Sequence, residues 1–288
     1  MPNVRGRYIV ETDWLAEHLD APDLVVLDGS THLPTSGRNA KEEYAAEHIP
    51  GAMFFDINAV ADQSNPLPHM LPSPVQFSSM MKKMGIGDGM RVIAYDSEGL
   101  YSAGRVWWMF RTMGHEDVAV LHGGLKTWKA ENRPTTNEPP PARSERHFTA
   151  RFNAGLVRDL DDVKAITAGG PEQIIDARAA ARFRGEVAEP RKGLRAGHMP
   201  GAFNVPFTTL LREDGTLKPT EELAKAFADA GVDLHKPITA SCGSGVTAGV
   251  IALALAMIGH PDAAVYDGSW SEWGHEDAGT VVVTGAEG

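Results

Sequence analysis

The chain repeats itself, and this repeat constrains its fold more than any other feature of the sequence. The sequence HIPGA at residues 48–52 recurs as HMPGA at residues 198–202. The segment 114–123, which begins with Gly-His and ends with Gly, recurs in the same form at 259–268. Because these matches keep their order and nearly their spacing, the chain consists of two copies of one structural unit in tandem.

A proline-rich stretch separates the two copies. It contains three consecutive prolines, Pro139, Pro140 and Pro141. Consecutive prolines cannot continue a helix or an inner strand, and they form a semi-rigid extended spacer. We therefore predict a first domain at 1–134, a linker at 135–147 and a second domain at 148–288.

Each copy alternates short apolar runs with longer amphipathic stretches, which is typical of α/β proteins. This alternation predicts a mostly parallel sheet flanked by helices in each domain. Sites in open sheets of this kind lie beyond the carboxyl ends of the strands. In the second copy we expect strands at 173–175, 202–205, 237–240 and 263–266, and helices at 221–230 and 248–258.

The only cysteine of the chain follows one of these strands. Residues 242–247 read CGSGVT and lead directly into the apolar stretch 248–258. The glycines let the backbone turn so that several amides point inward, and the helix dipole adds partial positive charge. Such a cradle favours the thiolate of Cys242 and would equally hold a persulfide, which is also an anion. The alternative is a structural cysteine, because free cysteines are often buried.

A missing arginine argues against one class of cysteine enzyme. Cysteine phosphatases need an arginine six residues after the cysteine to bind the phosphoryl oxygens. Position 248 is alanine, and no Arg or Lys lies between Cys242 and Ile258. Phosphatase activity is therefore disfavoured.

The corresponding loop of the first copy lacks a cysteine. It spans residues 96–103 and contains two acids, Asp96 and Glu98. Because acidic side chains repel an anion, we expect the first domain to be chemically silent at its own loop.

Charge and composition limit the partners. The net charge of −11 argues against a general nucleic-acid binder. The most apolar run, 246–258, is too short to span a bilayer, and a single cysteine cannot form an internal disulfide, so we expect no membrane partner and a cytoplasmic location. No metal-ligand spacing and no phosphate or dinucleotide fingerprint occurs, so neither a metal nor a dissociable cofactor is expected.

Three sets of residues together resemble the two-domain rhodanese-type sulfurtransferases. They are the repeated HIPGA-type segments, the sequence YSAGRVWW at 101–108 and the sequence DGSWSEW at 267–273. The resemblance covers essentially the whole chain. Within the family, CGSGVT resembles the loop of the branch that uses 3-mercaptopyruvate, whereas the thiosulfate branch has basic residues after the cysteine, as in CRKGVT. Thiosulfate is a dianion, whereas mercaptopyruvate carries one carboxylate some distance from its sulfur.

The resemblance implies a substrate-binding set. Arg182 and Arg191 match two arginines that bind the substrate carboxylate, with Arg184 as the alternative for Arg182. Without the resemblance we would interpret all three as solvated surface arginines. The backbone of the Cys242 loop would contribute the remaining binding groups, through Gly243, Gly245, Val246 and Thr247.

The resemblance also implies catalytic roles. Cys242 would be the nucleophile, while Ser244 and His69 would manage the proton of the substrate thiol. The acid that accompanies this histidine falls at Asn58, which cannot stabilise an imidazolium as a carboxylate does, with Asp62 as the alternative. The alternative for His69 is a structural role, as a loop or capping histidine.

For two other histidines and for three tryptophans we expect structural roles. His48 and His198 occupy the same place in both copies, so we expect each to make a structural hydrogen bond. Trp107, Trp108 and Trp128 are expected to pack in the core or between domains.

The function implied is transfer of sulfur from 3-mercaptopyruvate, a small 2-keto thiol, through a persulfide on Cys242, with release of pyruvate. The acceptor would be a thiol, a thioredoxin-like protein or cyanide. Two alternatives stay open. One is a thiosulfate:cyanide sulfurtransferase, and the other is a sulfur-relay protein that accepts persulfide from a partner without turning over a small donor.

Overall fold

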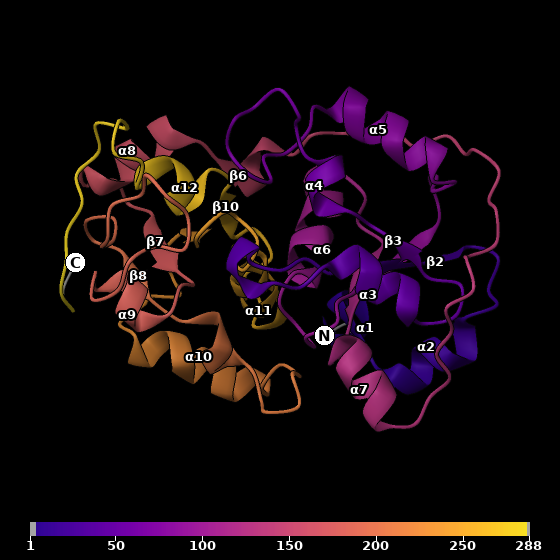
Figure 1. The fold of residues 1–288 in the computed structure, drawn as a ribbon. Helices are drawn as coiled ribbons and strands as arrows, with labels where there is room; N and C mark the ends of the chain where they lie inside the picture. The colour runs from indigo at the N-terminus through magenta and orange to yellow at the C-terminus, as the bar shows by residue number, and fades with distance from the viewer. Residues whose placement is uncertain (1–3, 287–288) are drawn as a thin grey trace. The chain divides into compact units, whose positions relative to one another are not determined.

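Two compact units make up the computed structural model, which describes residues 4–286 (Figure 1). Unit 1 contains the chain up to Gln63, Leu71–Asn153 and Arg212–Leu217, and unit 2 contains Ser64–Met70, Ala154–Leu211 and the chain from Lys218 onward. The segment 64–70 therefore belongs to the same unit as Cys242. The boundary between the units falls after Asn153, whereas the sequence suggested a second domain from 148.

Unit 1 contains a five-stranded parallel sheet in the order β1-β5-β4-β2-β3. The strands are β1 (Ile9–Val10), β2 (Leu24–Asp28), β3 (Met53–Phe54), β4 (Arg91–Tyr95) and β5 (Val118–Leu121). The helices are α1 (Val4–Tyr8), α2 (Thr12–His18), α3 (Ala40–Ala46), α4 (Ile57–Val60), α5 (Pro74–Lys83), α6 (Ala103–Thr112) and α7 (Gly124–Ala130), with a 3₁₀ turn η1 (Pro34–Ser36).

Unit 2 repeats this arrangement, with a parallel sheet in the order β6-β10-β9-β7-β8. The strands are β6 (Val157–Arg158), β7 (Gln173–Asp176), β8 (Phe203–Asn204), β9 (Ile238–Ser241) and β10 (Ala264–Tyr266). The helices are α8 (Leu160–Thr167), α9 (Ala180–Phe183), α10 (Thr220–Asp229), α11 (Ala248–Met257) and α12 (Ser269–Trp273), with 3₁₀ turns η2 (Ala154–Leu156) and η3 (Phe207–Leu210).

The identical strand order confirms both the duplication and the α/β fold. The register repeats as well, because Asp28 pairs with Tyr95 in unit 1 and Asp176 pairs with Ser241 in unit 2. In both units the residue after the central strand, Asp96 or Cys242, therefore emerges at the same edge of the sheet as this aspartate. Each predicted strand and helix of unit 2 is present, with ends that differ by at most one residue.

The helix that follows each central strand is buried. Every residue of α11 is buried, as expected for a stretch that is apolar on all sides. Every residue of α6 is also buried, although the helix contains two arginines. These lie over tryptophan rings of the same helix: Arg105 is 4.5 Å from the Trp108 ring centre, and Arg111 is 4.8 Å from that of Trp107. The three tryptophans singled out above are thus core residues of unit 1.

The proline-rich stretch 135–147 lies within unit 1. Thr136 and His48 exchange backbone hydrogen bonds of 2.9 Å in both directions. Arg143 also donates to the carbonyl of Leu24, at 2.9 Å. No helix among the described residues combines the length and apolar character that a membrane span requires.

Candidate active site

The Cys242 loop of unit 2 connects β9 to α11. Cys242 follows Ser241, the last residue of β9, and its free thiol is buried, with 2% of the residue exposed. Gly245 has a φ of 76°, a left-handed conformation that favours glycine. The helix begins at Ala248 after Thr247, whose side chain makes no capping hydrogen bond. The first amides of α11 are therefore not covered by a side-chain cap at that position.

The start of α12 fixes the backbone of the cysteine. The Ser269 hydroxyl accepts a hydrogen bond from the Cys242 amide at 3.2 Å and donates to the carbonyl of Tyr266 at 2.8 Å. The Trp270 amide donates to the Cys242 carbonyl at 3.0 Å. Ser269 has a φ of 50°, which is uncommon for a residue other than glycine and marks local strain. The sequence DGSWSEW supplied this serine, but sequence reasoning gave it no role.

The next peptide is fixed in the same way. Ser271 donates to the carbonyl of Gly243 through its amide, at 2.8 Å, and through its hydroxyl, at 2.7 Å. Both peptides that flank the Cys242–Gly243 bond thus contact one short helix, which pre-organises the loop.

The equivalent loop of unit 1 has its own anion in place. The buried Asp96 carboxylate accepts hydrogen bonds at 2.8 Å from the amides of Tyr101, Ser102 and Ala103, and one at 3.0 Å from Glu98. Asp96 occupies the position that Cys242 has in unit 2. The sequence suggested that acids would repel an anion here. The structure adds that the amides at the start of α6 already bind one.

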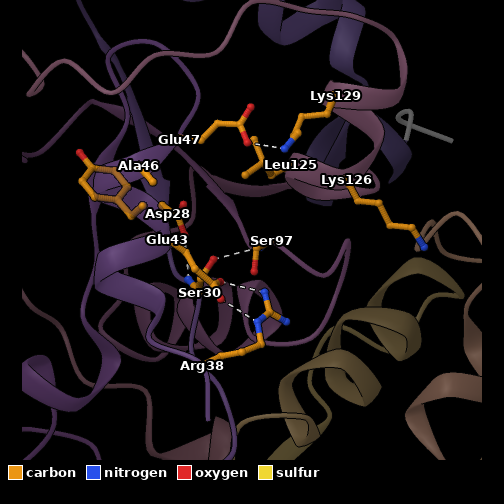
Figure 2. Close-up of a pocket in the computed structure, with 11 residues that line it drawn as sticks. Asp28, Ser30, Arg38, Glu43, Ala46, Glu47, Ser97, Leu125, Lys126 and Lys129 are labelled. Atoms are coloured by element: carbon orange, nitrogen blue, oxygen red, sulfur yellow. Dashed lines mark hydrogen bonds and ion pairs between the residues drawn. The ribbon is translucent and has the colours of Figure 1, made fainter. Parts of the chain in front are cut away.

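A pocket of about 470 Å³ lies at this edge of the unit 1 sheet, and two of the basic side chains that line it pair with acids. Figure 2 shows Arg38 beside Glu43 and Lys129 beside Glu47. Burial raises the pKa of Asp28, at the base of the pocket, above its ordinary range. The lining also includes Ser30, Tyr44, Ala46, Ser97, Leu125 and Lys126.

Arg182 lies against the Cys242 loop. It belongs to α9, and a Cβ atom placed on Gly243 would stand 3.1 Å from its Nη2 atom. The same guanidinium donates from Nε and Nη2 to the carboxylate of Glu189, at 3.1 and 2.5 Å. With 19% of its side chain exposed, Arg182 keeps access to solvent. The structure thus places this predicted residue beside the loop.

Two further charged residues, which sequence reasoning did not single out, support Arg182. Glu189 also accepts a hydrogen bond from Arg178 at 2.9 Å. Arg178 in turn donates to both carboxylate oxygens of Asp176 and lies 4.1 Å from the centre of the Trp270 ring. Unit 1 has Ser30 at the position of Arg178, so the difference between the repeats was a signal that could have revealed it.

Arg191 and His69 lie together. The Nη2 atom of Arg191 is 3.4 Å from Nε2 of His69, which the segment 64–70 brings into unit 2. Arg191 also lines a cavity of about 470 Å³ with Ser271 and Glu272, and the apolar part of the wall comes from Pro66, Leu67, Pro68, Leu160 and Leu194. Because Ser271 binds the Gly243 carbonyl, this cavity adjoins the Cys242 loop.

One carboxyl group of this cavity has a perturbed pKa. Burial raises the pKa of Glu272, and the nearby charges of Asp159 and Asp267 add to this effect. The nearby Tyr266 hydroxyl acts in the opposite direction and lowers the pKa of Glu272. Sequence reasoning did not identify this group.

Other predicted residues fall in distinct places. Ser244, Val246 and Thr247 are buried in the loop. Arg184 forms an exposed pair with Glu186, at 2.6 and 2.9 Å, and so is a surface arginine.

The acid partner of His69 stays a prediction. Asn58 lies in α4, where its backbone amide donates to the carboxylate of Asp56 at 2.9 Å. Both Asn58 and Asp62 belong to unit 1, whereas His69 belongs to unit 2.

The histidines of the repeated segments have structural partners, as expected. Nδ1 of His48 lies 2.7 Å from the carbonyl oxygen of Tyr44. Nδ1 of His198 lies 2.8 Å from that of Phe183, and its ring stacks on the Phe183 ring with 3.7 Å between centres.

The fold and the match to a protein-family model define the family of this chain. A family model described as the rhodanese-like domain matches residues 11–131 and again 159–276. The chain belongs to this family and carries two copies of its domain.

Particular relatives narrow the comparison. The chain is 48% identical over 268 residues to the 3-mercaptopyruvate sulfurtransferase of Escherichia coli strain K12, covering 93% of this chain and 95% of the relative. It is 43% identical over 276 residues to the thiosulfate sulfurtransferase of Gallus gallus, covering 94% of each. The crystal structure of SseA from E. coli, described as a 3-mercaptopyruvate sulfotransferase, matches with a TM-score of 0.83 and 47% identity, covering 92% of this chain and 99% of that one.

Proposed function

We propose that the chain moves sulfur from 3-mercaptopyruvate to a thiophilic acceptor through a persulfide on Cys242. The observation that carries the proposal is the position of Arg182 beside Gly243, in a loop that itself contains no basic side chain. Positive charge thus reaches the loop from outside it, through a planar guanidinium. This arrangement suits a donor whose carboxylate and carbonyl lie a few bonds from its sulfur.

Arg182 and Arg191 are proposed to bind the two ends of the 2-keto acid group. A guanidinium offers paired N–H donors that match a carboxylate or a carboxylate and its neighbouring carbonyl. The contact of Arg191 with His69 supports a second arginine close to the group proposed to transfer protons.

The first half-reaction forms the persulfide. The Cys242 thiolate attacks the substrate sulfur, a new S–S bond forms, and the C–S bond breaks with its electron pair left on carbon. The substrate thiol proton passes to that carbon through Ser244 and His69, so the enolate becomes pyruvate. No external oxidant or reductant enters this step.

The loop amides are proposed to stabilise the persulfide anion. The amides at the start of α11 have no side-chain cap, and the helix dipole favours negative charge there. Asp96 supports this assignment, because the repeated loop of unit 1 binds a carboxylate with four amides at the equivalent position.

In the second half-reaction an acceptor thiolate attacks the outer sulfur of the persulfide and releases the Cys242 thiolate. We propose a small thiol or a thioredoxin-like protein as the acceptor, with cyanide as a laboratory substitute. A reducing compartment keeps such acceptors in the thiol form, and the cytoplasm is the compartment that we propose.

Thiosulfate is the second candidate donor, because the Gallus gallus relative is named for it. Thiosulfate is a dianion whose charge lies directly on the group that carries the sulfur. The uncharged loop from Gly243 to Thr247 favours the keto acid instead.

A comparison of the two donors tests the proposal. We expect kcat/KM for 3-mercaptopyruvate to exceed that for thiosulfate, with pyruvate released in step with sulfur transfer. A preference for thiosulfate by about tenfold or more would reverse the donor assignment. Persulfide formation only from a sulfur-loaded partner protein, with neither small donor used, would instead indicate a relay.

A further inference from the structure

Four charged side chains of unit 2 form an alternating chain that ends at the Cys242 loop. In order they are Asp176, Arg178, Glu189 and Arg182, and successive members are joined by hydrogen bonds. The side chains of the first three are essentially buried, with 0%, 1% and 1% exposed, and Arg182 is 19% exposed. The proposed function uses only Arg182, so the roles of the other three are unassigned.

Glu189 determines which edge of Arg182 is available. A guanidinium can bind a carboxylate through its Nε and Nη2 side or through its Nη1 and Nη2 end. Glu189 occupies the first of these, at 3.1 and 2.5 Å. The second faces the loop, because a Cβ atom on Gly243 would stand 3.1 Å from Nη2, 3.9 Å from Nη1 and 4.0 Å from Cζ.

Glu189 is itself fixed. Arg178 donates to Glu189 from Nη1 at 2.9 Å, while its Nη2 donates to Asp176 at 2.6 Å and to the Gly197 carbonyl at 2.8 Å. The Arg178 guanidinium also lies over the Trp270 ring. The Glu189 carboxylate therefore cannot follow a movement of Arg182, and it sets the direction of that side chain.

Glu189 also sets the charge. The four side chains carry two negative and two positive charges. This network is therefore neutral as a whole, although it presents a guanidinium edge to the loop. A neutral network attracts a dianion less than one with an excess positive charge, because the Coulomb energy scales with the ligand charge.

We propose that Glu189 is a positioning residue that directs the Nη1–Nη2 edge of Arg182 toward the Cys242 loop and, by neutralising it, favours a monoanionic keto acid over a dianionic donor. This inference rests on the proposed function. It adds a determinant of donor choice that lies outside the cysteine loop.

The test compares Glu189→Gln, Glu189→Asp and the control Glu186→Gln in the full chain, with both donors. The control removes the same charge from the same segment but touches only the exposed Arg184. Glu189→Gln should raise KM for mercaptopyruvate about tenfold, the loss expected for a charged hydrogen bond, and should raise the ratio of thiosulfate to mercaptopyruvate kcat/KM. The control should change neither.

Glu189→Asp keeps the negative charge of residue 189 but moves its carboxylate, so it separates the effect of position from the effect of charge. Because it also keeps a partner for Arg178, it serves as the test if Glu189→Gln does not fold. It should raise KM for mercaptopyruvate because the carboxylate is shorter, while the donor ratio stays that of the wild type. A double variant of Glu189→Gln with Arg182→Lys should have the same KM for mercaptopyruvate as Arg182→Lys alone. Unchanged KM and donor ratio in an active background, or additive effects in the double variant, would overturn the inference. A wild type that releases no pyruvate from mercaptopyruvate would refute the proposed function instead.

Discussion

The guanidinium of Arg182 lies so close to Gly243 that a Cβ atom on the glycine would stand 3.1 Å from Nη2, and Arg182 would have to shift to admit a side chain there. The loop thus keeps a glycine at two positions for different reasons. Gly245 has a left-handed φ of 76°, whereas the constraint on Gly243 comes from the arginine.

Gly243→Ala should therefore act mainly on substrate binding. We expect a rise in KM for mercaptopyruvate of about threefold to tenfold, because Arg182 must shift by a few tenths of an ångström, with little change in melting temperature. Gly245→Ala should instead lose about 1 kcal/mol of stability, since alanine is strained at positive φ. Steady-state kinetics and thermal unfolding of both variants distinguish the two effects. A larger fall in melting temperature for Gly243→Ala than for Gly245→Ala would contradict this assignment.

The Ser269 hydroxyl should matter for the rate rather than for binding. Ser269→Gly removes the acceptor of the Cys242 amide and at the same time relieves the strained φ of 50°. We expect the single-turnover rate of persulfide formation to fall about tenfold at saturating donor, with KM nearly unchanged. Rapid-mixing kinetics with excess mercaptopyruvate provide the measurement. A wild-type rate in a folded variant would show that the hydrogen bond does not position the cysteine.

Asp96 should contribute stability and no catalysis. Asp96→Ala leaves four backbone amides of unit 1 without their carboxylate acceptor, so we expect a loss of about 3 kcal/mol from the unfolding free energy of that unit. The activity per folded molecule should stay that of the wild type. Denaturant unfolding followed by an activity assay at low temperature checks both expectations. A stable variant with reduced kcat would mean that the unit 1 loop takes part in the reaction.

The raised pKa of Glu272 predicts that the stability of the protein depends on pH. Burial raises the pKa of this carboxyl in the folded state, so the folded protein holds a proton that the unfolded chain releases. Stability should therefore fall as the pH rises from the ordinary glutamate pKa through the raised one, and the penalty should be complete above it. Glu272→Gln should be more stable than the wild type at pH 8, and the difference should vanish near pH 4.

The control for this experiment is Glu276→Gln, a substitution of an exposed residue in the same segment. It should not show the same pH-dependent gain in melting temperature. An equal gain in both variants would assign the effect to net charge rather than to the burial of Glu272.

The sequence predicted those features that depend on neighbouring residues. The repeat predicted two domains of one topology, and the run of strand, CGSGVT and apolar helix predicted the Cys242 loop, because each signal is contiguous. The two-residue strand β6 was not predicted, since Val157–Arg158 is too short to show an alternation. It forms through pairing with β10, a partner that is distant in the sequence.

The support for Arg182 escaped prediction for a similar reason. Arg178 and Glu189 look like ordinary charged residues until β7 and the following loop bring them together in a buried network. The role of Ser269 depends on a contact with Cys242 across the fold. The arginines and His69 were assigned by resemblance alone, because no local pattern indicates that a side chain will face a distant loop.

The central claim is that Cys242 carries the sulfur of mercaptopyruvate. Intact-protein mass spectrometry after incubation with 3-mercaptopyruvate, in the absence of an acceptor, tests it most directly. We predict a gain of one sulfur atom per chain in the wild type, its loss when a thiol acceptor is added, and no gain in Cys242→Ser. An unchanged wild-type mass, or an equal gain in Cys242→Ser, would contradict the account.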